Sequence, residues 1–257
     1  MRRFILALLC CALPASPALA WGQTGHRVTG AVAERYLSGA ARANVQLLLG
    51  TETLAQAATW PDDMRSDPAE FWQKTASPFH YVTVPAGSTH SATGAPPEGD
   101  AVTALERFAQ VLRDPDASAA DKRLALRFTI HIIGDLHQPL HAGRPGDRGG
   151  NDVKVTLFGA QTNLHSVWDS GMIDARQLSH GELAEWLVGA ITPAQVVAWS
   201  NPDPQIWIAE SVALRETLYP ANPKLSYAYA YQHGAALDGR LSRGGVRIAA
   251  YLNRIFG

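Results

Sequence analysis

The sequence predicts a mainly α-helical, single compact domain with one small β-hairpin. Three observations point to this fold class. Apolar residues recur at three-four spacing along most of the chain, plausible N-caps precede these repeats, and only one stretch alternates as a strand does. No internal repeat and no linker of biased composition divides the chain, so one domain is the simpler interpretation.

The first twenty residues have the features of an export signal. Arg2 and Arg3 precede an apolar stretch at 5–13, and residues 18–20 have the small-x-small pattern of a cleavage site. We therefore expect residues 1–20 to be removed and the mature protein to be secreted or periplasmic.

The mature domain, residues 21–257, is expected to be a soluble monomer with no membrane partner. Both cysteines, Cys10 and Cys11, lie in the leader, so no disulfide is expected in the mature chain. No later stretch approaches the roughly 20 apolar residues that a transmembrane helix needs. The 22 basic and 23 acidic residues nearly balance, and no basic stripe marks a nucleic-acid groove. Metal ions would therefore have to attract any phosphate substrate.

Helices are expected along most of the mature chain. The apolar repeats and their caps are Val28, Ala31 and Val32 after Thr24; Val102, Leu105, Ala109 and Leu112 after Asp100; and Ile248, Tyr251, Leu252 and Ile255 near the C-terminus. Thr192-Pro193 and Asp203-Pro204 place a proline in the first turn of two further helices. Ser118 and Asp121 predict a capping box, and residues 124–136 behind it are apolar nearly all round, as in a buried central helix.

One stretch predicts strands, and two predict loops. Val153, Val155 and Leu157 alternate with Lys154, Thr156 and Phe158, and Gly159 supplies a turn. This pattern predicts a hairpin. The segments 84–99 and 142–150 are rich in Gly, Pro and Ser, and we expect both to form the rim of a cleft.

Two pairs of metal-binding side chains have the i, i+4 spacing of a helix. His131 and Asp135 share one stripe of the buried helix, and His165 and Asp169 repeat the spacing. A buried histidine alone is more often a hydrogen-bonded core residue than a ligand, but a buried carboxylate without a cation is costly. His141 follows the end of the same helix. Imidazole nitrogens and carboxylate oxygens together suit zinc.

These residues belong to an ordered series of nine candidate metal ligands. The series is Trp21, His26, Asp62, His80, His131, Asp135, His141, His165 and Asp169. The segments that carry it are Trp21-Gly22-Gln23-Thr24-Gly25-His26, Thr59-Trp60-Pro61-Asp62-Asp63, Phe79-His80-Tyr81, His131-Ile132-Ile133-Gly134-Asp135, Gln138-Pro139-Leu140-His141, Gly149-Gly150-Asn151-Asp152, and Asn163-Leu164-His165 to Trp168-Asp169. In this order and spacing, the whole mature chain resembles the S1/P1 nuclease family.

The resemblance implies a mainly α-helical domain of the phospholipase C and S1/P1 nuclease type. It also implies a secreted, zinc-dependent hydrolase of single-stranded RNA and DNA that gives 5′-phosphorylated products and has 3′-nucleotidase activity. The compact leader and the cysteine-free mature chain favour a bacterial member.

The resemblance distributes the nine ligands among three zinc ions. One zinc takes Asp62, His80 and His131, and a second takes His141, His165 and Asp169. The third takes His26, Asp135 and the amino nitrogen and carbonyl oxygen of Trp21. A free α-amine and its own carbonyl can close a five-membered chelate, which an internal Trp21 cannot offer, so export and activation would be coupled.

The resemblance also implies roles near these ligands. Asp62 would orient the attacking water, and Arg65 and Asn151 would contact phosphate. Tyr81 matches an aromatic on which a base stacks, whereas Thr83 stands where fungal relatives carry an acidic residue that bonds the base. Two alternatives stay open at this point, because Arg65 could be a solvated surface residue and Tyr81 could belong to the core.

Two other functions remain as alternatives. A zinc-dependent phospholipase C shares the tri-zinc helical scaffold, but it carries a glutamate at the place of Asp169 and a longer gap than that between Trp21 and His26. A non-catalytic zinc-binding protein would close each metal sphere with four protein ligands, whereas these spheres have three side chains or fewer. The remaining histidines are expected on the surface or in the core; they are His90, His137, His180 and His233.

Overall fold

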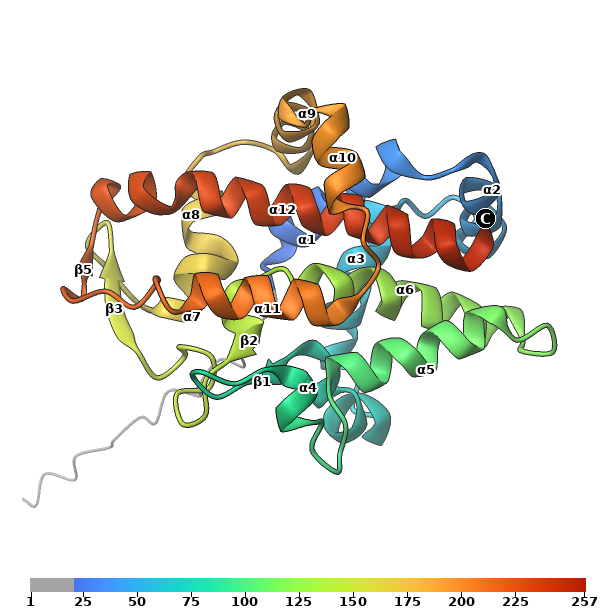
Figure 1. Cartoon of the computed structure of the whole chain (residues 1–257), viewed down its shortest axis with the longest axis horizontal. Helices are drawn as coiled ribbons and strands as arrows, with labels where there is room; N and C mark the ends of the chain where they lie inside the picture. Colours follow the sequence, from blue (N-terminus) through green and yellow to red (C-terminus); the bar gives the residue numbers. More distant parts are fainter. Residues whose placement is uncertain (1–20) are drawn as a thin grey trace, which may run out of the picture.

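The computed structural model describes residues 21–257, so the predicted export signal at 1–20 lies outside the described residues. The main helices are α1 (Gln23–Tyr36), α2 (Gly39–Leu49), α3 (Leu54–Asp63), α5 (Ala101–Arg113), α6 (Ala119–Asp135), α9 (His180–Ala190), α10 (Pro193–Trp199), α11 (Pro204–Arg215) and α12 (Tyr227–Phe256). Shorter helices are η1 (Met64–Ser66), η2 (Phe71–Thr75), η3 (Ser77–His80), α4 (His90–Thr93), η4 (Pro139–His141), α7 (Leu164–Ser166), η5 (Val167–Gly171) and α8 (Met172–Asp174). The predicted mainly α-helical fold class is confirmed (Figure 1). Across residues 21–257, none of the helices combines the length and apolar character needed to cross a bilayer.

Helix α6 is the predicted buried helix. The Ser118 hydroxyl accepts a hydrogen bond from the Asp121 N–H at 3.1 Å and donates one to the Asp121 carboxylate at 2.7 Å. From Ala125 to Asp135 every residue except Arg127 is buried. Helices α2, α3, α5 and α12 pack against α6 and shield it from solvent. The last turn of α6 therefore lies in the interior, where a carboxylate needs partners.

The other predicted helix starts are confirmed with one exception. Asp100, Thr192 and Asp203 each cap a helix through the side chain. The predicted cap at Thr24 is wrong, because the N-cap is Gly22 and α1 therefore begins two residues earlier, at Gln23. The Gly22 N–H donates to the Asp169 carbonyl at 2.8 Å, so a tertiary contact decides where α1 starts.

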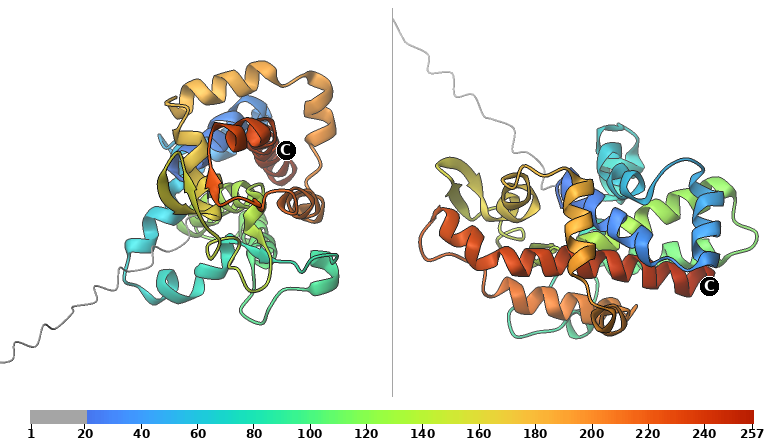
Figure 2. Two further views of the ribbon diagram at one scale, coloured as in Figure 1. Left: turned by 90° about the vertical axis from the view of Figure 1, so that its left-hand side faces the viewer. Right: turned by 90° about the horizontal axis from the view of Figure 1, so that it is seen from above.

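Helices α1 and α12 cross closely, and α9 and α10 cover them from above (Figure 1, Figure 2). The contact between α1 and α12 is close because α12 presents Gly244 and Gly245 to α1. A Cβ at Gly244 would lie 3.2 Å from a Thr29 methyl, and one at Gly245 would overlap the Val32 side chain. Both helices contribute to the two buried apolar clusters of the protein.

The predicted hairpin is confirmed, and two further strand pairings accompany it. Strands β3 (Lys154–Leu157) and β4 (Ala160–Asn163) pair antiparallel, and the turn residues Phe158 and Gly159 have φ of 50° and 88°. Strand β5 (Lys224–Leu225) adds to β3 in parallel. Strands β1 (Val82–Thr83) and β2 (Ala142–Gly143) form a separate parallel pair. The expectation of a single strand region is therefore wrong, because two-residue strands carry no alternation that a sequence could display.

The contact between α1 and α12 gives a test of packing. Gly245→Ala should lower the free energy of unfolding by about 1–3 kcal/mol, because the new methyl overlaps Val32. Gly239→Ala lies on the same helix where a Cβ meets nothing within 4 Å, so it should be neutral or stabilising by about 0.5–1 kcal/mol. Thermal and urea unfolding of both variants measure the difference. Equal stability of the two variants would contradict the close approach of the helices.

Candidate metal centre and cleft

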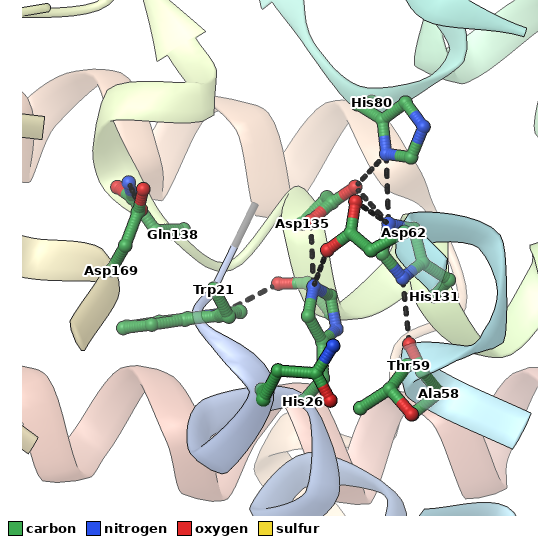
Figure 3. A network of polar contacts seen from close by, with 12 residues as sticks. Trp21, His26, Ala58, Thr59, Asp62, His80, His131, Asp135, Gln138 and Asp169 are labelled. Atoms are coloured by element: carbon green, nitrogen blue, oxygen red, sulfur yellow. Dashed lines mark hydrogen bonds and ion pairs between the residues drawn. The ribbon is translucent and has the colours of Figure 1, made fainter. Parts of the chain in front are cut away.

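Eight of the nine predicted ligands bring their side chains to one buried site, and Figure 3 shows six of them: His26, Asp62, His80, His131, Asp135 and Asp169. They come from α1 (His26), α3 (Asp62), η3 (His80), α6 (His131 and Asp135), η4 (His141), α7 (His165) and η5 (Asp169). Each side chain is 6% exposed or less. Helix geometry accounts for only part of this convergence, because only the pairs His131 with Asp135 and His165 with Asp169 are related by i, i+4 spacing and the other ligands come from separate segments.

Asp135 is the centre of the first group of ligands. Its Oδ2 lies 3.0 Å from His131 Nε2 and 3.1 Å from His80 Nδ1, and its Oδ1 lies 3.3 Å from His26 Nε2. Asp62 approaches His26 and His131 at 4.0 and 3.9 Å. The first and third predicted ligand sets are therefore contiguous, and the Asp135 carboxylate joins them. Spacing along the chain could not reveal this, because it depends on which way each oxygen points.

The second group consists of His141, His165 and Asp169. His165 Nε2 lies 3.2 Å from Asp169 Oδ2, and the rings of His141 and His165 are 5.0 Å apart. The i, i+4 spacing that predicted this pair is realised across a short α-helical turn followed by a π-helical turn. A continuous α-helix is therefore not required to bring the two side chains together.

Backbone carbonyls fix the orientation of three of the imidazoles. A carbonyl can only accept, so each partnered Nδ1 carries the proton and leaves the Nε2 lone pair for a metal. The three hydrogen bonds are His131 to Ala58 at 2.6 Å, His141 to His80 at 2.6 Å, and His165 to Gly149 at 2.7 Å. This arrangement is typical of metal-binding histidines.

Buried polar atoms without hydrogen bonds show that the site fits cations. Among residues 21–257, the buried side-chain atoms that lack a hydrogen bond include five of the cluster: His26 Nδ1 and Nε2, Asp62 Oδ1, Asp135 Oδ1 and His141 Nε2. Each such atom costs roughly 1–3 kcal/mol if it stays unsatisfied. Nitrogen and carboxylate donors in this arrangement match the ligand chemistry of zinc.

The pKa values of two ligands agree with this interpretation, whereas burial lowers the pKa of His131 but the Asp135 and Asp62 carboxylates outweigh burial and raise it. Burial lowers the pKa of His80 to about 4, so its imidazole is neutral at pH 7, as a ligand must be. Burial raises the pKa of Asp169 well above its usual range, and the nearby charges of Asp135 and Asp62 raise it further. A bound divalent cation would remove that penalty and favour the carboxylate.

Gln138 is a functional residue that the sequence interpretation missed. It is fully buried. Its Nε2 donates to Asp169 Oδ1 at 2.5 Å, and its Oε1 accepts the Leu140 N–H at 2.5 Å (Figure 3). Gln138 thereby holds one oxygen of Asp169 and leaves the other beside His165. The available signal was its place in the segment Gln138-Pro139-Leu140-His141.

The ninth predicted ligand, Trp21, lies between the two groups. Its side chain is fully buried, and Nε1 donates to the Gly134 carbonyl at 2.8 Å. The Gly22 N–H donates to the Asp169 carbonyl, also at 2.8 Å. The start of the described chain is therefore tied both to the residue before Asp135 and to Asp169 itself.

The ligand cluster opens onto a cavity of about 410 Å³. Arg65, Tyr81 and Asn151 line it. Arg65 Nε lies 3.1 Å from Asp62 Oδ1 with the arginine side chain 24% exposed, so Arg65 is not a solvated surface residue. Tyr81 is 46% exposed and is not part of the core. Asn151 is buried, and its Nδ2 donates to the Arg148 carbonyl at 2.8 Å.

The two predicted rim loops differ. Residues 143–146, 148 and 149 line the cavity as expected, but none of the described lining residues comes from 84–99. Residues 88–91 instead line a separate cavity of about 300 Å³ against α11, because His90 Nε2 pairs with Asp100 at 2.7 Å and His90 Nδ1 meets Gln205 of α11 at 3.1 Å. These contacts hold the segment against α11.

An ion-pair network behind the cluster fixes the end of α6. Glu210 of α11 pairs with Arg240 and Arg247 of α12, each at 2.6 Å. Arg240 donates to the His137 carbonyl at 3.0 Å, and the Ser211 hydroxyl donates to the Leu136 carbonyl at 2.6 Å. These bonds satisfy the carbonyls that follow Asp135 and so hold its turn in place. His137 is a core residue, as expected, and so is His233.

A buried group of imidazoles and carboxylates beside a cleft on a helical scaffold is the kind of site that multinuclear metal-dependent hydrolases use. The family model described as S1/P1 Nuclease matches residues 21–257. The chain belongs to the S1/P1 nuclease family. It is therefore a nuclease, a hydrolase that cleaves phosphodiester bonds.

Named relatives agree with the family match over nearly their whole length. The chain is 30% identical to Endonuclease 4 of Arabidopsis thaliana, over 100% of this chain and 96% of the relative. It is 29% identical to Nuclease P1 of Penicillium citrinum, over 92% and 98%, and 28% identical to Nuclease S1 of Aspergillus oryzae, over 91% of each. The match is to nucleases rather than to a phospholipase C.

The network behind the cluster predicts a dependence of stability on pH. Burial raises the pKa of Glu210, but hydrogen bonds and charges from Arg247 and Arg240 outweigh burial and lower it to about 2. The stabilisation is therefore present above pH 4.5 and is lost as the pH falls toward 2. Glu210→Gln should lower the free energy of unfolding by about 2 kcal/mol above pH 5, and this difference should shrink between pH 4.5 and 2.

Urea unfolding from pH 7 to 2.5 measures this difference between the protein and the variant. Glu70→Gln serves as the control, because it removes only an exposed pair with Lys74 and should cost less than about 1 kcal/mol at every pH. A difference for Glu210→Gln that stays constant down to pH 2.5 would contradict the proposed ionisation.

Proposed function

We propose that the protein hydrolyses single-stranded RNA and DNA to 5′-phosphorylated products and also acts as a 3′-nucleotidase. The observation that carries this proposal is the buried His/Asp cluster, which opens onto a cavity lined by an arginine, an exposed tyrosine and an asparagine. Single strands suit this cavity because an exposed aromatic ring can stack on an unpaired base.

We propose zinc as the resident metal, with three ions held by the nine predicted ligands. Asp62, His80 and His131 would hold one, with the Asp135 carboxylate adjacent; His141, His165 and Asp169 would hold another; and His26, Asp135 and Trp21 would hold the third. The ligand atoms of His141, His165 and Asp169 lie within 4.8 Å of one another, which supports that set. The ligand atoms of the other two sets interleave, because His26 lies near Asp62 and His131, and Asp135 lies near His80 and His131. Bound zinc supplies Lewis-acid activation of water and of phosphate oxygens.

The chain's own residues would place the substrate and the attacking water. Asp62, whose Oδ1 is 3.1 Å from Arg65 Nε, would orient the water for in-line attack at phosphorus. Arg65 and Asn151 would stabilise the negative charge that develops on the phosphate. The bond to the 3′ oxygen breaks, which leaves the phosphate on the 5′ side of the product. Tyr81 would stack on the base next to the scissile bond.

Export and activity would be coupled through Trp21. We propose that removal of residues 1–20 outside the cytoplasm frees the α-amine of Trp21, and that residues 21–257 then act as one secreted or periplasmic domain. The hydrogen bonds of Trp21 to Gly134 and of Gly22 to Asp169 support this proposal, since they hold the N-terminal segment beside both ligand groups.

A substrate panel tests the function. The mature protein should hydrolyse single-stranded RNA, single-stranded DNA and 3′-AMP, and it should leave phosphatidylcholine intact. Complete chelation should abolish all three activities, and added zinc should restore them. End-group analysis of the oligonucleotide products should find 5′-phosphates. Hydrolysis of phosphatidylcholine but not RNA would favour a phospholipase C, and activity on nothing in the panel would favour a zinc-binding protein.

The role of the N-terminus is tested by adding one residue. Protein that begins at Trp21 should bind about three zinc ions, whereas protein that retains Ala20 should bind about one fewer and cleave single-stranded RNA poorly. An unperturbed α-amine has a pKa of about 7.7 to 8.0, so zinc can displace its proton near neutral pH. Elemental analysis measures the zinc content, and a form with one residue added after Gly257 controls for chain length. Full zinc content and full activity in the Ala20 form would show that the chelate does not exist.

A further inference from the structure

We propose that Arg144 and Arg148 bind a second phosphate of the substrate, so that the enzyme favours oligonucleotide strands over 3′-mononucleotides. This inference rests on the nuclease function proposed above and names the substrate class that the same site prefers.

The cavity beside the ligand cluster is lined by several arginines, one of which, Arg65, pairs with the predicted ligand Asp62. Its three arginines are Arg65, Arg144 and Arg148, and none of the described residues that line it is an aspartate or glutamate. The whole chain has a formal net charge of −1, so this positive charge is local. Charge of one sign in a cleft raises the local concentration of a ligand of the opposite sign. A strand with several phosphates is therefore attracted to this cavity more strongly than a molecule with a single phosphate.

Strand pairing sets the separation between the backbone of Arg144 and the backbone of Tyr81. In the parallel pair β1–β2, Val82 lies opposite Ala142 and Thr83 opposite Gly143. Tyr81 therefore precedes this pair and Arg144 follows it, about 10 Å apart along the strand direction at three residues of extended chain. An arginine whose backbone lies this far along the strands from that of the stacking tyrosine is suited to a phosphate of a neighbouring nucleotide, whereas Arg65 pairs with Asp62 in the ligand cluster.

Arg144 is held in place before any substrate arrives. Its guanidinium lies over the Tyr219 ring at 3.9 Å from the centroid and pairs with Glu216. Glu216 also pairs with Arg215, at 2.7 Å. Glu216 thus serves two guanidinium groups, and Asp147, which accepts a hydrogen bond from the Tyr219 hydroxyl, is a further carboxylate whose charge acts on Arg144. A stacked, planar guanidinium loses little freedom when it binds a phosphate through two hydrogen bonds.

Arg148 occupies backbone that usually favours glycine. Its φ is 51°, and its neighbours Gly149 and Gly150 have φ of 61° and 82°. Its carbonyl accepts the Asn151 side-chain hydrogen bond, which stabilises this conformation. The side chain is 68% exposed and pairs with Asp152, which is 46% exposed; such a pair is weak enough for a phosphate to replace. A strained arginine where glycine would fit more easily points to a role for its side chain.

The test compares substrates with one phosphate and with several. Arg144→Gln, Arg148→Gln and the unchanged protein are assayed on an eight-nucleotide DNA strand and on 3′-AMP, at several salt concentrations. Arg176→Gln is the matched control, since it removes the same charge from an arginine that pairs with Asp238 outside the cavity. Zinc content and melting temperature are measured for each protein. Arg148 is exposed, so its variant should fold even if Arg144→Gln does not.

Each of the two variants should lower the ratio of kcat/KM on the octanucleotide to kcat/KM on 3′-AMP about tenfold. The slope of log(kcat/KM) against log salt on the octanucleotide should become shallower by about 0.7 for each lost phosphate contact. Arg176→Gln should change neither quantity. An unchanged ratio, whether both substrates suffer equally or neither suffers, would overturn the proposal. If the unchanged protein cleaved neither substrate, the proposed nuclease function itself would fail.

Discussion

The burial of the Asp135 carboxylate among imidazoles is the constraint on which the rest of the structure depends. Asp135 is fully buried, and three histidine nitrogens lie within 3.3 Å of its oxygens. Such a group is stable only if cations, or protons in their place, neutralise it. Several buried atoms of the cluster have no hydrogen bond among the described residues. The fold therefore maintains an arrangement whose cost metal binding would offset, so metal binding and stability would be linked.

Contacts around the cluster keep its ligand side chains from moving apart. Arg240 and Ser211 bind the carbonyls after Asp135, and Gln138 holds one oxygen of Asp169. On the other side of α6, Phe128 stacks on Phe108 with centroids 4.7 Å apart and meets Phe79, the neighbour of His80, edge-on. Interlocked aromatic packing and satisfied helix ends keep the ligands from separating to find water or other partners. A preorganised site needs little rearrangement when it binds a metal.

The short parallel pair β1–β2 connects the metal centre to the substrate cleft. It places the segment after His80 beside the segment after His141, so each strand begins next to a ligand and ends at the cavity. The exposed ring of Tyr81 and the guanidinium of Arg144 thereby lie on either side of one small structural unit. Because both strands are anchored by ligands, the geometry of the cleft depends on the geometry of the metal site.

Sequence by itself determined the helices, the hairpin, the family and the set of side chains that gather at the candidate metal site. It could do so because amphipathic periods, the caps at Asp100 and Ser118, and the i, i+4 pairs are local properties of the chain. Only the tertiary structure decided that Asp135 joins two ligand groups, that Gln138 holds Asp169, and that α1 starts at Gln23 rather than after Thr24. It also decided that residues 84–99 pack on α11 and away from the cavity. These features depend on which atoms of distant segments meet, and a one-dimensional pattern contains no information about that until packing brings them together.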